Sequence, residues 1–240
     1  MKYQVFLSSK VSHLKDGDGI IVIEPDDYTS DQVKAIKKKG YKVLAYLSVG
    51  TLEKERSWYS KYKSLRLKRL EDWQNEWYVD VRKKAWRKFL YARAEALKKK
   101  GFDGLWCDNL DVYEYCKSTA MANACYTALT NLKKYGFIMV NGGAEFFEYA
   151  MKKVDLKVMV NGVTQEEVFS LIKDYDGKGK FGTQTKEMHD YYVGYLKKLK
   201  KRGIKCFLLE YTRDDKLKTK IKDFCKKEGM SYYISEDVDL

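Results

Sequence analysis

The sequence predicts an α/β fold, a single (β/α)₈ TIM barrel over residues 1–240, with a long Trp-rich insertion after the third strand. Two observations favour it. The segment Lys-Lys-x-Gly occurs five times, each time after a helix-like stretch, and most copies lead into a short apolar run. The length of 240 residues is also close to that of a typical barrel. The five copies lie at residues 37–40, 98–101, 133–136, 200–203 and 226–229.

Each Lys-Lys-x-Gly segment has a physical interpretation. Lysines in the last turn of a helix interact favourably with the negative end of the helix dipole. A glycine just past that turn supplies the left-handed residue that commonly ends a helix. The segment therefore indicates that a helix ends and a strand begins. Repeated alternation of this kind is typical of a parallel sheet covered by helices.

Eight strands are expected in order along the chain. The continuous apolar run from Ile20 to Ile23 is typical of a strand covered on both faces. The first connection, residues 8–18, is too short for a crossover helix and predicts only a turn. A seven-strand variant and an open doubly wound sheet are the alternatives. The expected strands are residues 3–7, 19–23, 42–47, 104–107, 137–140, 157–160, 205–209 and 232–234, and the expected helices are residues 30–39, 81–100, 118–135, 145–153, 185–202 and 216–228.

The connection after the third strand is the longest, at residues 49–101. Residues 51–69 are rich in charge, and we interpret them as helical. Residues 73–82 then contain Trp73 and Trp77. A tryptophan-rich insertion above one strand commonly forms a lid or a wall of a binding site.

The charge is distributed unevenly. The formal net charge is +13, but the lysines are spread over helix ends and faces without an Arg-rich stripe. We interpret them as a solvated surface and expect no nucleic-acid partner. The predicted turns at the carboxyl ends of the strands are instead acidic or amide-bearing, as in residues 24–27 and 108–111. Active sites of barrels lie at that end, so we predict a negatively charged face around the active site.

Several kinds of site find no support in the sequence. Five cysteines without a C-x-x-C or metal-ligand spacing predict reduced thiols and no metal. His13 and His189 are interpreted as ordinary surface or packing residues. A G-x-G-x-x-G sequence occurs at residues 177–182, but it follows residues 166–173, which we interpret as helical. A dinucleotide site requires a preceding strand, so we interpret this segment as a flexible loop and expect no cofactor.

Compartment and assembly remain open at this point. No signal peptide or membrane span precedes the first predicted strand, at residues 3–7. A secreted protein whose leader had been removed would look the same, so the sequence allows an extracellular or a cytoplasmic location. We expect a monomer.

Carboxylates are the remaining candidates for chemistry. Asp108 directly follows a buried strand, so we expect it to face the barrel mouth, partly desolvated by Trp106. Glu166 lies just beyond the predicted sixth strand, and its alternative interpretation is an acid in the first turn of a helix. Two carboxylates in one cleft can differ in pKa, so that one keeps its proton. Glycoside hydrolysis requires such a pair. Glu210 is a third candidate.

Three motifs resemble glycoside hydrolase family 114, the endo-α-1,4-polygalactosaminidase family related to spherulin-4-like proteins. They are residues 45–50, residues 77–82 with Trp86, and residues 101–111. The similarity extends in order over essentially the whole chain. The resemblance implies a (β/α)₈ barrel without metal or cofactor that hydrolyses α-1,4-linked galactosamine polymers. The family's catalytic Asp after the fourth strand and Glu after the sixth match Asp108 and Glu166.

Further residues are expected to bind the polysaccharide. The chain departs from the family at Glu24, where an aspartate is usual, and at Thr51, where an acidic residue often stands. These departures bear on the substrate subsites more than on the reaction. The expected substrate-binding residues are Glu24, Tyr46, Ser48, Trp73, Trp77, Asp111, Asn141, Glu210 and Tyr211.

The acidic mouth agrees with a cationic substrate. Deacetylated galactosamine polymers carry positive charge, and a negative cleft concentrates cations. A non-catalytic carbohydrate-binding barrel is the main alternative, and a basic nucleic-acid-binding protein is a second one.

Overall fold

A computed structural model of the chain describes residues 1–12, 14–176 and 178–240. His13, interpreted as an ordinary histidine, lies outside the described residues. So does Gly177, the first glycine of the G-x-G-x-x-G sequence.

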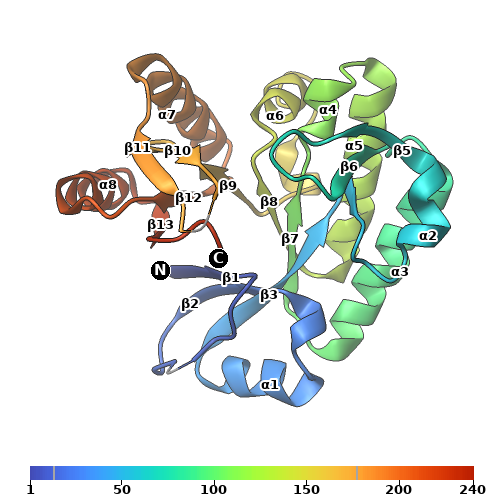
Figure 1. Cartoon of the computed structure of the whole chain (residues 1–240), viewed down its shortest axis with the longest axis horizontal. Coiled ribbons are helices and arrows are strands. Elements are labelled where there is room, and N and C mark those ends of the chain that lie inside the picture. The colour runs from blue at the N-terminus through green and yellow to red at the C-terminus, as the bar shows by residue number, and fades with distance from the viewer. Residues whose placement is uncertain (13, 177) are drawn as a thin grey trace.

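Eight parallel strands form one sheet in the order β1-β2-β3-β7-β8-β9-β12-β13. The sheet curls until its first and last strands lie next to each other, and Ser231 Oγ donates a 3.0 Å hydrogen bond to the Met1 carbonyl there. The predicted barrel is therefore confirmed, as a nearly closed one (Figure 1). The strands are β1 (Lys2–Phe6), β2 (Gly19–Ile23), β3 (Tyr41–Ser48), β7 (Gly104–Asp108), β8 (Phe137–Asn141), β9 (Gly162–Glu166), β12 (Lys205–Tyr211) and β13 (Ser231–Ser235).

Helices surround the strands, as Figure 1 shows. The long ones are α1 (Ser30–Lys38), α3 (Lys84–Lys100), α5 (Thr119–Leu132), α7 (Lys186–Lys201) and α8 (Asp215–Glu228); shorter ones are α2 (Tyr59–Tyr62), α4 (Val112–Tyr115) and α6 (Ala144–Ala150). The interpretation of the Lys-Lys-x-Gly segments is confirmed, because all five of their glycines have positive φ. These are Gly40, Gly101, Gly136, Gly203 and Gly229.

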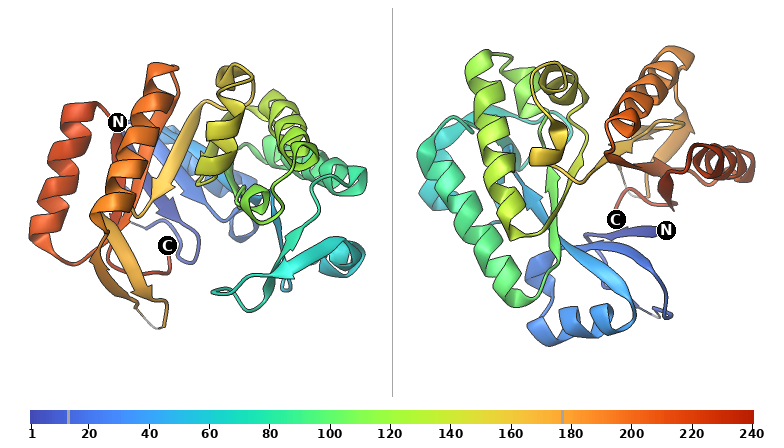
Figure 2. Two further views of the ribbon diagram at one scale, coloured as in Figure 1. Left: turned by 90° about the horizontal axis from the view of Figure 1, so that it is seen from above. Right: turned by 180° about the vertical axis from the view of Figure 1, so that it is seen from behind.

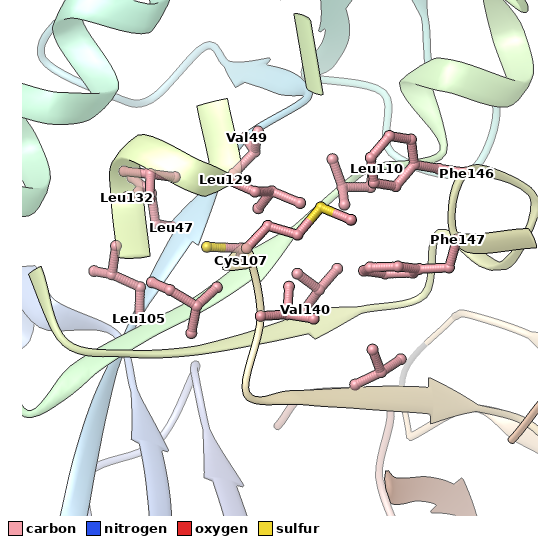
Figure 3. Packing of buried hydrophobic residues seen from close by; sticks show 14 of the residues in the cluster. Leu47, Val49, Leu105, Cys107, Leu110, Leu129, Leu132, Val140, Phe146 and Phe147 are labelled. Carbon is pink, nitrogen blue, oxygen red and sulfur yellow. The ribbon is translucent and has the colours of Figure 1, made fainter. Parts of the chain in front are cut away.

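Two hydrophobic layers stabilise the barrel, because successive side chains of a strand point to opposite faces. In β2, Ile20 and Val22 point into the barrel, while Ile21 and Ile23 pack against the outer helices. The larger, outer layer lies between the sheet and the helices. Figure 3 shows part of it, where Leu105 and Cys107 of β7 lie near Leu129 and Leu132 of α5.

The prediction of a strand at residues 157–160 is wrong. Leu156–Val158 forms a 3₁₀ turn instead, and β9 begins at Gly162. Residues 157–160 looked like a strand because they are mostly apolar. The real strand carries the polar residues Thr164 and Glu166 on the face that points into the barrel, so its sequence lacked that apolar signal.

The helical interpretation of residues 51–69 is right only for residues 59–65, which form α2 and a 3₁₀ turn; strands and turns make up the rest. Residues 166–173, also interpreted as helical, are largely extended. In the insertion, β4 (Thr51–Glu53), β5 (Arg66–Arg69) and β6 (Glu76–Val79) form an antiparallel sheet, and α2 is its only α-helix in the described chain. The basic residues that resembled a helical surface stack on an aromatic ring, since the Arg66 guanidinium lies 4.6 Å from the Trp77 ring centroid. After β9, β10 (Ser170–Asp174) and β11 (Lys180–Thr183) form a hairpin. The G-x-G-x-x-G sequence therefore connects two strands.

Glu210 is fully buried on the outer face of β12, away from the barrel interior. Its carboxylate accepts hydrogen bonds from the backbone N–H groups of Val168, Phe169 and Ser170, and a 2.6 Å bond from Ser170 Oγ. Burial raises the pKa of Glu210 to about 7, and these donors oppose the rise. The side chain thus holds the β9–β10 connection in place.

We expect Glu210→Ala to lower the free energy of unfolding by about 3 kcal/mol or more, because it leaves several buried donors without an acceptor. Glu210→Gln keeps one acceptor oxygen and should cost less. Urea denaturation measures both. Glu95→Ala, which removes an exposed partner of Lys99, is the control and should change stability by about 0.5 kcal/mol or less. A Glu210→Ala variant as stable as that control would contradict the structural role.

Candidate active site

A cavity of about 840 Å³ opens at the carboxyl ends of the barrel strands. The β4–β6 sheet and the β10–β11 hairpin project from the barrel on the same side (Figure 2). Ten carboxylates and a single arginine line the cavity, so the predicted acidic mouth is confirmed although the chain is basic overall. The carboxylates are Glu24, Glu53, Glu55, Asp72, Glu76, Asp108, Asp111, Glu166, Glu167 and Asp239.

The arginine, Arg56, is already bound within the protein. Its guanidinium donates to both carboxylate oxygens of Glu24, at 3.0 and 2.9 Å, and its Nε donates to Glu53 at 2.7 Å. It also lies 5.7 Å from the Tyr46 ring centroid. Arg56 therefore offsets part of the charge of Glu24 and Glu53 and leaves the cavity negative.

The centre of the cavity holds Asp108, Asn141 and Glu166, which end β7, β8 and β9. Asn141 Nδ2 donates to Asp108 Oδ1 at 3.0 Å and to Glu166 Oε1 at 2.5 Å. Because both oxygens bond to one nitrogen, they lie at most 5.5 Å apart, the sum of those two distances. The structure thus brings the two predicted carboxylates into one cavity.

Each carboxylate has a further donor. Tyr211 donates its phenol O–H to Glu166 Oε2 at 2.6 Å, and the Asn109 backbone N–H donates to Asp108 Oδ1 at 2.9 Å. Burial, and then the charge of Glu166, raise the pKa of Asp108 well above its usual value. Burial also raises the pKa of Glu166, against the hydrogen bonds from Tyr211 and Asn141. Two such close, buried carboxylates ionise in two steps and keep one proton over a range where isolated carboxyls have lost theirs.

Sequence reasoning missed a polar network beside Asp108, whose register partner on β3 is Ser48. Asn109 has a left-handed backbone, with φ 63°, and its Nδ2 donates to Ser48 Oγ at 3.0 Å and to Thr51 Oγ1 at 2.9 Å. Glu76 of the insertion joins this network, at 3.3 Å from Asn109 Nδ2, and burial raises its pKa to about 7. The only sequence signal for this network was the asparagine itself, because asparagine tolerates the left-handed backbone region better than most residues. No sequence signal pointed to Glu76, because the strand that carries it was not predicted.

The predicted substrate-binding residues divide into two groups. Ser48 is hydrogen-bonded within the polar network beside Asp108, Trp77 packs on Tyr59 at 5.8 Å between ring centroids, and Glu210 faces the helices. These three do not line the cavity, so we no longer expect them to contact a ligand there. The six that line it are Glu24, Tyr46, Trp73, Asp111, Asn141 and Tyr211.

Among the residues that the structure describes, no three His, Cys, Asp or Glu side chains gather closely enough to hold a metal ion. None of the described helices has the length and apolar character needed to cross a membrane.

Replacing Tyr211 tests the electrostatics of this centre. Tyr211→Phe removes a donor that stabilises the ionised form of Glu166, so the pKa of Glu166 should rise further. Carbon-13 NMR titration of labelled glutamate carboxyls measures the shift. Tyr135→Phe, at a helix end away from the cavity, is the control. An unchanged or lowered Glu166 pKa in Tyr211→Phe would contradict the hydrogen bond.

Comparison with known proteins gives consistent results. The profile of glycoside-hydrolase family GH114 matches residues 1–240. An uncharacterised protein of Methanocaldococcus jannaschii is 25% identical over 93% of this chain and 67% of its own length. The glycoside hydrolase domain of PelA from Pseudomonas aeruginosa aligns with 99% of this chain and 98% of its own, with a TM-score of 0.82 and 18% identity. Ega3 of Aspergillus fumigatus, solved in complex with galactosamine, aligns with 98% of this chain and 90% of its own, with a TM-score of 0.74 and 16% identity.

Proposed function

The chain belongs to glycoside hydrolase family GH114, and we propose that it cleaves α-1,4 linkages within galactosamine-containing polysaccharides, with Asp108 and Glu166 as the catalytic pair. Residues 1–240 act as one catalytic domain in this proposal. The observation that carries it is the single Asn141 amide that bonds to both carboxylates inside the cavity.

The pair has the chemistry that glycoside hydrolysis needs. One carboxylic acid protonates the departing glycosidic oxygen, and the other carboxylate attacks the anomeric carbon or activates a water. The acid must hold its proton near neutral pH, and burial in this cavity raises the pKa of both groups. Asn141 orients them, and Tyr211 favours the ionised form of Glu166.

The short separation supports a retaining reaction. Retaining glycosidases hold their carboxyl groups about 5–5.5 Å apart, and inverting ones about 6.5–9.5 Å, which leaves room for a water. The nearest oxygens of Asp108 and Glu166 lie within 5.5 Å of each other, the sum of their distances to Asn141 Nδ2. Direct attack of one carboxylate on the sugar, followed by hydrolysis of the glycosyl-enzyme, therefore fits better than attack by a water placed between them.

The charge of the cavity supports an amino-sugar polymer. Ten carboxylates face a single arginine that is already paired. Ammonium groups on a deacetylated polymer offset this negative charge, whereas the phosphates of a nucleic acid add to it. The galactosamine bound to Ega3 agrees with this choice, since that protein has the same fold.

Mass spectrometry after incubation with partly deacetylated α-1,4-galactosamine polymers tests the reaction. Short fragments are expected from the unaltered protein. Asp108→Asn and Glu166→Gln should each reduce turnover by about 10³-fold, because each removes one proton-transfer or nucleophilic group. Circular dichroism should show an intact fold. Glu95→Gln, an exposed carboxylate on α3, is the control and should cleave normally.

Two results would overturn the assignment. Near-normal turnover in Asp108→Asn or Glu166→Gln would remove that residue from the pair. Tight binding of the polymer without any fragments from the unaltered protein would favour the non-catalytic carbohydrate-binding alternative.

The stereochemical outcome is a separate prediction. Proton NMR of a reaction in progress should show the α-anomer of the new reducing end first, because two inversions restore the original configuration. Glu95→Gln, recorded in parallel, should give the same first product. Initial appearance of the β-anomer would contradict the retaining mechanism.

A further inference from the structure

Two connections that are distant in the sequence meet at the rim of the cavity. Trp73 lies between β5 and β6, and Tyr175 lies between β10 and β11. Their rings meet edge to face, with centroids 5.9 Å apart. The insertion and the hairpin that carry them extend past the ends of the barrel strands on the same side (Figure 2). We call this pair the aromatic arch.

The aromatic arch stays open to solvent although it lines the cavity. Trp73 is 50% exposed and Tyr175 37%, and both belong to the cavity lining. The other tryptophans of the insertion region, such as Trp77, are instead packed beneath arginines or other rings. Exposed aromatic faces that line a cavity are suited to an amphipathic ligand, because they pack on its apolar side while its polar groups stay hydrated.

Glu167 faces the cavity because of its backbone conformation. Strand alternation would send Glu166 and Glu167 to opposite faces. Glu167 has a left-handed φ of 55°, which turns the chain, and both residues line the cavity. This region is unfavourable for a residue with a side chain, at about 1–3 kcal/mol.

Asp72, next to Trp73, adds a second carboxylate beside the arch. Asp72 and Glu167 line the same cavity as Trp73 and Tyr175. Burial, and then the charges of Glu167 and Asp72, raise the pKa of Tyr175 to about 12. Within residues 1–12, 14–176 and 178–240, neither Asp72 nor Glu167 forms a salt bridge. Glu167 Oε1 accepts a hydrogen bond from the Ile172 backbone N–H, and burial raises the pKa of Glu167 to about 7. An ammonium group beside this carboxylate would favour its ionised form. Two carboxyl groups thus lie beside two exposed rings.

We propose that Trp73, Tyr175, Asp72 and Glu167 form a second sugar subsite, distinct from the Asp108–Glu166 centre, that binds a deacetylated hexosamine unit of the polymer. The rings pack on the apolar C–H face of the sugar, and the carboxylates bind its ammonium group. This assignment rests on the proposed function, because it assumes an amino-sugar polymer in the cavity.

The chemistry of the subsite separates it from other sugar sites. A neutral sugar gains the stacking contact but no ion pair, and an N-acetylated one has no ammonium to offer. An acidic sugar is repelled by both carboxylates. The subsite therefore selects for the deacetylated unit, at a position where no bond is broken, and the deacetylation pattern of the polymer determines where the chain can bind.

Binding measurements test this independently of hydrolysis. Calorimetric titrations use the Glu166→Gln protein as the parent and two oligosaccharides of equal length, one deacetylated and one fully N-acetylated. The parent should prefer the deacetylated one. Adding Trp73→Ala should weaken both by about tenfold, since both lose the stacking contact. Adding Glu167→Gln should weaken only the deacetylated one, by about tenfold, since only it loses a bond to a charged group.

The controls are conservative or adjacent changes. Trp73→Phe keeps an aromatic face and should retain most of the affinity. Glu71→Gln alters the acid next to Asp72, but Glu71 is paired with Lys68 at 2.7 Å and lies outside the cavity lining. It should leave both affinities unchanged.

Each outcome decides for or against the subsite. Parent-like binding in Trp73→Ala and Glu167→Gln overturns it, even if the unaltered protein cleaves the polymer. Equal loss for both oligosaccharides in Glu167→Gln overturns the ammonium assignment. Selective loss for the deacetylated oligosaccharide, in a protein that proves unable to cleave, supports the subsite while the proposed reaction fails.

Discussion

The alternation of side chains along the barrel strands is the constraint on which the site depends. A residue that points into the barrel interior is followed, two positions later, by one at the mouth. Hydrophobic or buried polar side chains fill the interior, and acidic, amide or phenol groups stand directly above them. The pairs are Trp106 and Asp108, Met139 and Asn141, Thr164 and Glu166, and Leu209 and Tyr211.

The filled interior determines the electrostatics above it. Trp106 Nε1 donates to Tyr3 Oη at 3.1 Å, so even the polar atoms of this layer are satisfied within the protein. Asp108 and Glu166 therefore lie above a layer of side chains that solvates them poorly. Burial is the first cause of the raised pKa of each group. The barrel and the insertion form the cavity together, because the insertion contributes Glu76 and Trp73 to its lining.

Much of this arrangement was predictable from the sequence, for physical reasons. Glycines after lysine-rich turns located the helix ends, and the acids after apolar runs located the mouth. Glu210 was misjudged because adjacency to a strand end was considered without alternation: Tyr211 points inward, so Glu210 must point outward. The left-handed backbone of Glu167 had no signal in the sequence, whereas asparagine, as at position 109, is a residue type that tolerates this conformation.

The antiparallel strands of the insertion were not predicted, for a related reason. Its basic side chains lie over aromatic rings, as Arg66 does over Trp77, so charge did not mark a helical surface. Similarly, β9 is polar where it faces the cavity, and an apolar run beside it was chosen in its place. Sequence patterns identified the strands that are apolar along most of their length and missed β9 and the strands of the insertion, which carry polar residues.

The coupling between Asp108 and Glu166 is the central claim, and an NMR titration of carbon-13-labelled aspartate carboxyls tests it most directly. Replacing Glu166 by glutamine removes the neighbouring charge, so the pKa of Asp108 should fall from its raised value, although burial still keeps it above that of an ordinary aspartate. An Asp108 pKa that does not change on this replacement would contradict the account, because it would mean that the two carboxylates do not share one electrostatic centre.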